Sequence, residues 1–72
     1  MTEQQQFLID AVVEGMAVRL VEDESLPVVD ALATVYGSTL YDKVNDVETG
    51  LYYQSACYNY NLLKQELDYG KP

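Results

Sequence analysis

Apolar residues recur at spacings of three and four along most of this chain, and this period restricts the chain to helices. Sustained alternation of apolar and polar residues is absent, as are the Asn-Gly and Asp-Gly pairs typical of hairpins. The 72 residues suffice for a single domain. The sequence therefore predicts an all-α domain spanning 1–72, a compact bundle whose third helix is short, with a frayed tail at 70–72. The predicted helices are at about 4–21, 26–36, 39–48 and 52–68.

The first predicted helix is apolar almost all round. Its broad face comprises Leu8, Ile9, Val12, Val13, Met16 and Leu20. A second patch beside that face comprises Phe7, Ala11, Gly15 and Val18. A helix of this kind belongs in the middle of a bundle or at a subunit interface. Ala11 and Gly15 are small and four residues apart, so another helix could approach them, although the spacing alone also arises by coincidence.

Capping residues set the predicted helix ends. Ser25 is interpreted as an N-cap, with Pro27 in the first turn, where a missing N–H is harmless. The face of that helix is predicted to comprise Val28, Val29, Leu32, Val35 and Tyr36. Gly37 is predicted to end it in the left-handed conformation. Ser38 or Thr39 would cap the third helix, with Asp42 placed as in a capping box.

Residues 49–67 hold four of the seven tyrosines. Their predicted core stripe comprises Tyr52, Ala56, Tyr60, Leu63 and Leu67, widened by Tyr53 and Cys57. Tyr58, Leu62 and Tyr69 form a smaller strip on the opposite flank. Tyrosines on such a flank are either half-covered by neighbouring side chains or serve as anchors for another chain. Cys57 is expected to be a small buried residue.

Composition excludes several kinds of site. With one cysteine and no histidine, neither a disulfide framework nor a cysteine-histidine catalytic pair is possible. Acidic pairs such as Asp42 with Asp46 are interpreted as solvated helix surface. We therefore expect no catalytic residue, no cofactor and no metal. A chain this short buries only roughly 60 per cent of its surface, so oligomerisation is the remaining way to add stability.

The net charge of −8 disfavours direct binding to nucleic acids and to anionic membranes. The N-terminal residues lack the basic region of a signal peptide and no apolar run is long enough to span a bilayer, so the protein is expected in the cytoplasm. Three alternatives remain open. The helices flanking Gly37 have the length of a DNA-binding helix-turn-helix, although 39–48 carries one lysine against three acids. The others are an acidic mimic of nucleic acid and a bundle that binds a small molecule or metal.

Four stretches of the chain resemble a group of small uncharacterised all-helical bacterial proteins. They are SLPVVDAL at 25–32, the Gly37 turn, LYDKV at 40–44 and GLYYQSACYNY from Gly50. Members of that group are often encoded beside toxin-like genes, including ADP-ribosyltransferase-like ones. The resemblance implies an antitoxin-like or accessory role and supplies no functional residues. The tyrosine-rich last helix departs from the group.

These observations predict a protein–protein interaction module. Its partner would be a second copy, giving a homodimer, or a basic protein. The candidate interface comprises Tyr58, Leu62, Tyr69, Phe7, Ala11 and Gly15.

Overall fold

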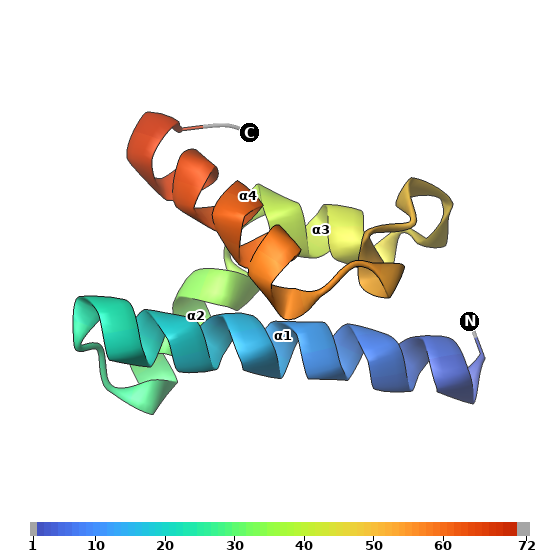
Figure 1. Ribbon diagram of the computed structural model, residues 1–72, viewed down its shortest axis with the longest axis horizontal. Helices are drawn as coiled ribbons and strands as arrows, with labels where there is room; N and C mark the ends of the chain where they lie inside the picture. Colours follow the sequence, from blue (N-terminus) through green and yellow to red (C-terminus); the bar gives the residue numbers. More distant parts are fainter. Residues whose placement is uncertain (1, 71–72) are drawn as a thin grey trace.

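The computed structural model describes residues 2–70 and confirms an all-α architecture (Figure 1). The four helices are α1 (Glu3–Glu24), α2 (Val28–Tyr36), α3 (Thr39–Asn45) and α4 (Ala56–Tyr69). Two single 3-10 turns, η1 (Val47–Thr49) and η2 (Leu51–Tyr53), connect α3 to α4. The predicted frayed tail at 70–72 lies outside the described residues except for Gly70.

The ends of α1 differ from the prediction because of its caps. Thr2 and Gln5 form a capping box, in which each side chain accepts the other residue's backbone N–H, so the helix starts at Glu3. At the other end Ser25 takes the left-handed conformation (φ 55°) and closes α1. The predicted N-cap role of Ser25 is therefore wrong. Pro27 precedes α2 without a side-chain cap.

The turn between α2 and α3 corrects two further predictions. Gly37 is right-handed (φ −85°), not left-handed, because only Gly37 and Ser38 separate the two helices. The hydroxyl of Ser38 accepts the Tyr41 N–H at 3.1 Å and is the N-cap of α3. Thr39 is therefore inside the helix, and Asp42 is one position too late for a capping box.

Helix α4 begins at Ala56, four residues later than predicted, and α3 ends at Asn45 instead of residue 48. Gly50 reverses the chain between η1 and η2 with φ 71°. The fully buried Asn59 then fastens η2 to the start of α4, because its side-chain N–H group donates to the carbonyls of Leu51 at 2.9 Å and Ser55 at 3.1 Å. These side-chain bonds stabilise turns where the apolar pattern predicts continuous helix.

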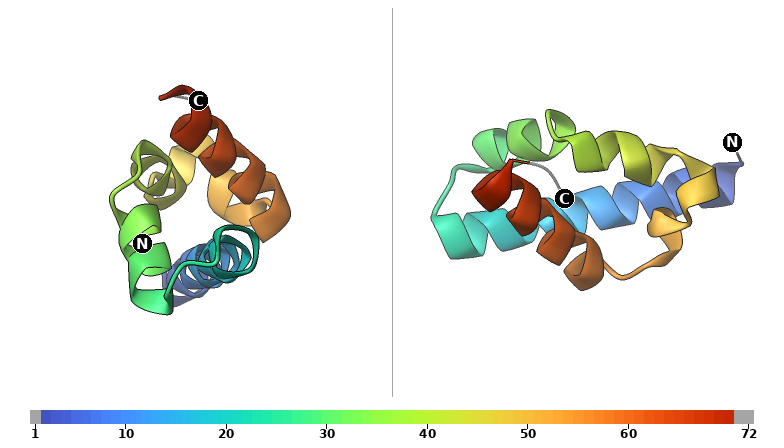
Figure 2. Two further views of the ribbon diagram at one scale, coloured as in Figure 1. Left: turned by 90° about the vertical axis from the view of Figure 1, so that its left-hand side faces the viewer. Right: turned by 90° about the horizontal axis from the view of Figure 1, so that it is seen from above.

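Viewed end-on, the four helices surround a single core (Figure 2). Helix α1 contributes nearly half of it: Ile9, Val12, Val13, Met16, Ala17 and Leu20. The other helices and η2 supply Ala31, Val35, Leu40, Val44, Tyr52, Tyr60 and Leu63. Of the two apolar patches of α1, the broad one therefore faces the core, and Phe7 and Val18 of the second patch are exposed.

Two predicted core faces are only partly buried. Helix α2 buries Ala31 and Val35, whereas Val28, Val29 and Tyr36 are exposed. Helix α4 buries Asn59, Tyr60 and Leu63, which places Cys57 on the outer side of its first turn. The expectation that Cys57 is buried is therefore wrong. Leu67 is also exposed, because the end of α4 rises away from α1 (Figure 1).

Candidate protein-binding surface

Helix α4 meets α1 at a very close contact between Gly15 and Ala56. A β-carbon added to Gly15 would lie only 2.5 Å from the β-carbon of Ala56. Nearer the end of α1, the Tyr60 hydroxyl donates to Asp23 at 2.8 Å, and Lys64 pairs with Glu24 at 2.6 Å. Gly15 is thus part of an internal helix contact.

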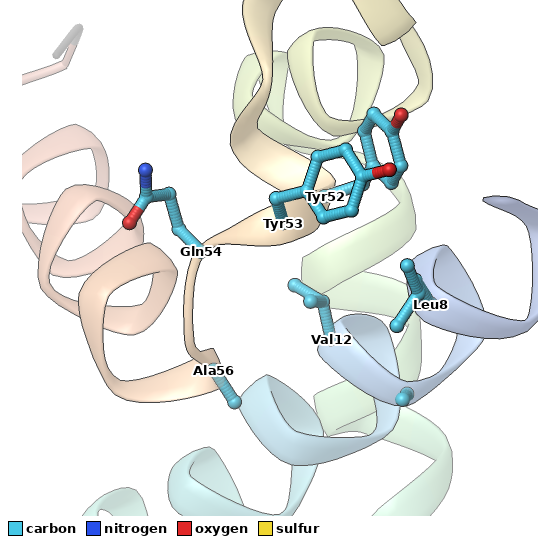
Figure 3. Close-up of a pocket in the computed structure, with 7 residues that line it drawn as sticks. Leu8, Val12, Tyr52, Tyr53, Gln54 and Ala56 are labelled. Atoms are coloured by element: carbon cyan, nitrogen blue, oxygen red, sulfur yellow. The ribbon is translucent and has the colours of Figure 1, made fainter.

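This contact leaves a groove where η2 leads into α4. Because α4 begins only at Ala56, the short extended link at Gln54 and Ser55 spans the distance between η2 and α4 beside α1. The resulting pocket, with a volume of about 240 Å³, is called the α1 groove below (Figure 3). It is lined by Leu8, Ala11, Val12, Tyr52, Tyr53, Gln54 and Ala56.

Two tyrosines form one wall of the α1 groove. Tyr52 is buried, and its hydroxyl accepts a hydrogen bond from the Gln5 side chain at 3.2 Å. The ring of Tyr53 packs on that of Tyr52 with centroids 4.4 Å apart and remains 69% exposed. The hydrogen bond with the Tyr52 side chain raises the pKa of Tyr53 above its ordinary value. The groove therefore offers apolar walls with neutral hydrogen-bonding groups at its edge, a lining suited to binding.

An exposed phenylalanine lies beside the α1 groove. Phe7 is 71% exposed and precedes the groove residue Ala11 by four positions, so the two share one face of α1. Asp10 and Glu14 follow Phe7 and Ala11, respectively, by three positions and adjoin that face. Residues 2–18 contain no lysine or arginine. This part of the surface is thus apolar with an acidic border.

The six predicted interface residues do not form one surface. Phe7 and Ala11 adjoin the α1 groove, whereas Gly15 is used inside the fold. The other three share one side of α4, where Tyr58 is 49% exposed, Leu62 is half-buried against the core and Tyr69 is 82% exposed. The last turn of α4 lies at the opposite end of the molecule's long axis from the first turns of α1 (Figures 1 and 2).

The sequence interpretation missed an apolar surface on α2. Val29 is 75% exposed, and Val28 and Tyr36 are also exposed. Tyr36 makes an edge contact with Tyr41 of α3, with ring centroids 5.0 Å apart. Periodicity identifies this helix as amphipathic, but α2 is apolar over so much of its circumference that the pattern does not choose the buried side.

A carboxylate occupies the N-terminus of α3. The Glu66 side chain of α4 accepts hydrogen bonds from the backbone N–H groups of Thr39 at 2.7 Å and Leu40 at 2.9 Å. The negative charge is favourable there because a helix N-terminus carries a partial positive charge. These amides, at the start of the second helix of the predicted helix-turn-helix, are therefore already bound within the fold.

Metal-ligand clusters and membrane-spanning helices are not found within residues 2–70. Across that range no group of three or more histidine, cysteine or acidic side chains could hold a metal ion. No helix in the same range has the length and hydropathy needed to cross a membrane. No protein-family model, curated protein or solved structure matches the chain significantly.

Proposed function

We propose that this protein is a non-catalytic interaction module of the bacterial cytoplasm that binds a basic protein, in an antitoxin-like or accessory role. The observation that carries the proposal is the apolar surface formed by the α1 groove and the exposed Phe7 beside it, on a chain with a net charge of −8. Contiguous apolar exposure on a small domain is typical of an interaction surface.

Charge favours a basic partner over a second copy. Within the described part of the chain, the pair between Lys64 and Glu24 is the one salt bridge. Most carboxylates are therefore available to cations on another molecule. Association of two copies would instead bring −8 against −8, which opposes dimerisation at low ionic strength.

Direct DNA binding through α2 and α3 is a weaker alternative. A recognition helix presents its N-terminal residues to the bases. Here the Glu66 carboxylate bonds the first amides of α3, and Asp42 and Asp46 add negative charge near that helix. Phosphates approaching this end would be repelled.

The first experiment is to measure the solution mass over a dilution series by sedimentation, together with retention on a duplex-DNA column. We expect a monomer that passes through the column. A dimer that persists on dilution would mean that the partner is a second copy of this chain and not a basic protein. Retention on the column would favour DNA binding through α2 and α3.

Co-expression with the protein encoded beside this one then tests for a partner directly. A complex that weakens as salt is raised is the expected result, because opposite surface charges are screened. A complex that is insensitive to salt would contradict the role assigned to charge.

A further inference from the structure

We infer that the α1 groove receives an apolar side chain from a basic amphipathic helix of the partner; this inference rests on the proposed function. The groove is closer in size to a side chain than to a cofactor, since its volume of about 240 Å³ is below the range of roughly 300 to 1,000 Å³ usual for small-molecule sites. Amphipathic helices insert anchors of this kind at spacings of three and four into apolar grooves.

The surface beside the groove fits such a helix. Phe7 and Ala11 extend the apolar surface along α1 for one turn, and Phe7 is largely exposed. A partner helix lying along α1 could therefore cover both the groove and Phe7. The Tyr53 hydroxyl offers a hydrogen bond at the groove edge without adding charge, whereas the Gln54 amide points away from Leu8 and Val12 (Figure 3).

The acidic border fixes the charge of the partner. Glu3, Asp10 and Glu14 are spaced by seven and four residues, so they form a row along one side of α1. At 1.5 Å per residue the row is about 16 Å long. Phe7 follows Glu3 by four positions and precedes Asp10 by three, so it lies between the row and the groove. Lysine or arginine beside the apolar face of a partner helix would meet this row.

A second copy is a poorer occupant of the same surface. Pairing two α1 helices through Phe7 and Ala11 would bring two rows of three carboxylates together. Residues 2–18 contain no base, and the next one along α1, Arg19, already donates to the Gly15 carbonyl at 3.1 Å. Electrostatic complementarity determines which partners are rejected as well as which are bound.

The test uses a synthetic 18-residue leucine–lysine peptide designed as an amphipathic helix. Its controls are the same peptide with every lysine replaced by glutamate, and one with every leucine replaced by serine. Binding is followed by amide chemical shifts in NMR titrations. We expect the leucine–lysine peptide alone to bind strongly, with the largest shifts at residues 7–12 and 52–56.

Two pairs of variants locate the binding. Ala11→Gln fills the mouth of the groove without adding charge, and Ala33→Gln makes the same change on the exposed side of α2. Both positions are exposed, so both variants should keep the helical circular dichroism signal. We expect about tenfold weaker binding for Ala11→Gln, as for the loss of an apolar anchor, and unchanged binding for Ala33→Gln.

The second pair of variants separates a local effect of charge from general attraction. Each double variant replaces two of the acids and changes the net charge from −8 to −6. The first variant combines Asp10→Asn with Glu14→Gln, and the second combines Asp42→Asn with Glu48→Gln. The first should weaken binding by roughly three- to tenfold, as for two exposed ion pairs, and the second much less. Equal losses would mean nonspecific attraction and would overturn the inference.

The outcomes also separate this inference from the proposed function. Tight binding with shifts confined to α2 or α4, unaffected by Ala11→Gln, would overturn the groove as the site and leave the proposed function standing. Equal binding of the glutamate peptide, or no binding of the leucine–lysine peptide, would overturn both.

Discussion

Replacing Gly15 by alanine tests the close contact between α1 and α4 through the sign of the stability change. In an exposed helix interior, glycine to alanine stabilises by about 1 kcal/mol because alanine restricts the unfolded chain and favours helix. At Gly15, however, the new β-carbon would lie 2.5 Å from the β-carbon of Ala56. Ordinary carbon contacts are about 3.5 to 4.0 Å, so the start of α4 must shift by about 1 Å.

The steric clash with Ala56 and the gain in helix propensity have opposite effects on stability, and we expect the clash to be the larger of the two. Overpacking of a tight contact costs roughly 1 to 3 kcal/mol, against a gain of about 1 kcal/mol in helix propensity. Gly15→Ala should therefore destabilise by about 1 kcal/mol, which lowers the Tm of a domain this size by about 4 to 8 °C. Urea unfolding followed by circular dichroism measures the free energy, and thermal unfolding followed by the same signal measures the Tm.

Two further variants make the result interpretable. Ala11→Gly, on the exposed side of the same helix, should lose about 1 kcal/mol through propensity alone. Ala56→Gly combined with Gly15→Ala removes the clashing atom, so the pair should show a favourable coupling of about 1 kcal/mol. A stabilised Gly15→Ala protein, or purely additive effects, would refute the close contact.

Four other measurements test individual contacts. Glu66→Ala leaves two amides at the start of α3 without their carboxylate and should cost about 1 to 2 kcal/mol of unfolding free energy in urea melts; no change would mean that water replaces it. Burial and the hydrogen bond to Asp23 raise the pKa of Tyr60 from 10.0 to about 12. Tyr60 therefore loses its proton at lower pH in the unfolded chain than in the folded protein, so the free energy of unfolding should fall between pH 10 and 12. The free energy of unfolding of the Tyr60→Phe variant should fall less steeply over the same range. Asn59→Asp removes both donated hydrogen bonds and buries a carboxylate, so thermal melting should reveal a loss of at least about 3 kcal/mol, and a smaller loss would contradict full burial. Cys57 is exposed, so a thiol reagent should label the native protein as fast as the unfolded one, and slow labelling would indicate that the thiol is covered.

Much of the secondary structure follows from local pattern. The broad apolar face of α1 can be read from the sequence because its residues repeat at three and four from Leu8 to Leu20, whereas periodicity leaves open which of the two apolar patches of α1 is buried. Tyr58 and Tyr69 are likewise placed on an exposed side of α4. The start of α4 is predicted four residues too early because the apolar run from Leu51 to Tyr53 is compatible with both a helix and a turn. The deciding contact there is the Asn59 side chain, which no periodicity reports.

The candidate site was only half visible in the sequence. Phe7 and Ala11 could be singled out because a second apolar strip on one helix is unusual. Their neighbours Tyr52 and Tyr53 were assigned to the core stripe of another helix. The spacing of Glu3, Asp10 and Glu14 can be read from the sequence. Whether this row borders an exposed apolar surface depends on which side of α1 faces outward.

Local sequence pattern is sufficient to predict an acidic, all-helical chain with four apolar segments, because helix formation depends on neighbours three and four residues apart. The tertiary structure alone decided the rotation of each helix about its axis, which exposes Val29 and Cys57. It also decided the α1 groove, whose walls come from residues 8–12 and 52–56. These features depend on packing between segments some forty residues apart, and the contact of Gly15 with Ala56 that sets their distance leaves no periodic signal.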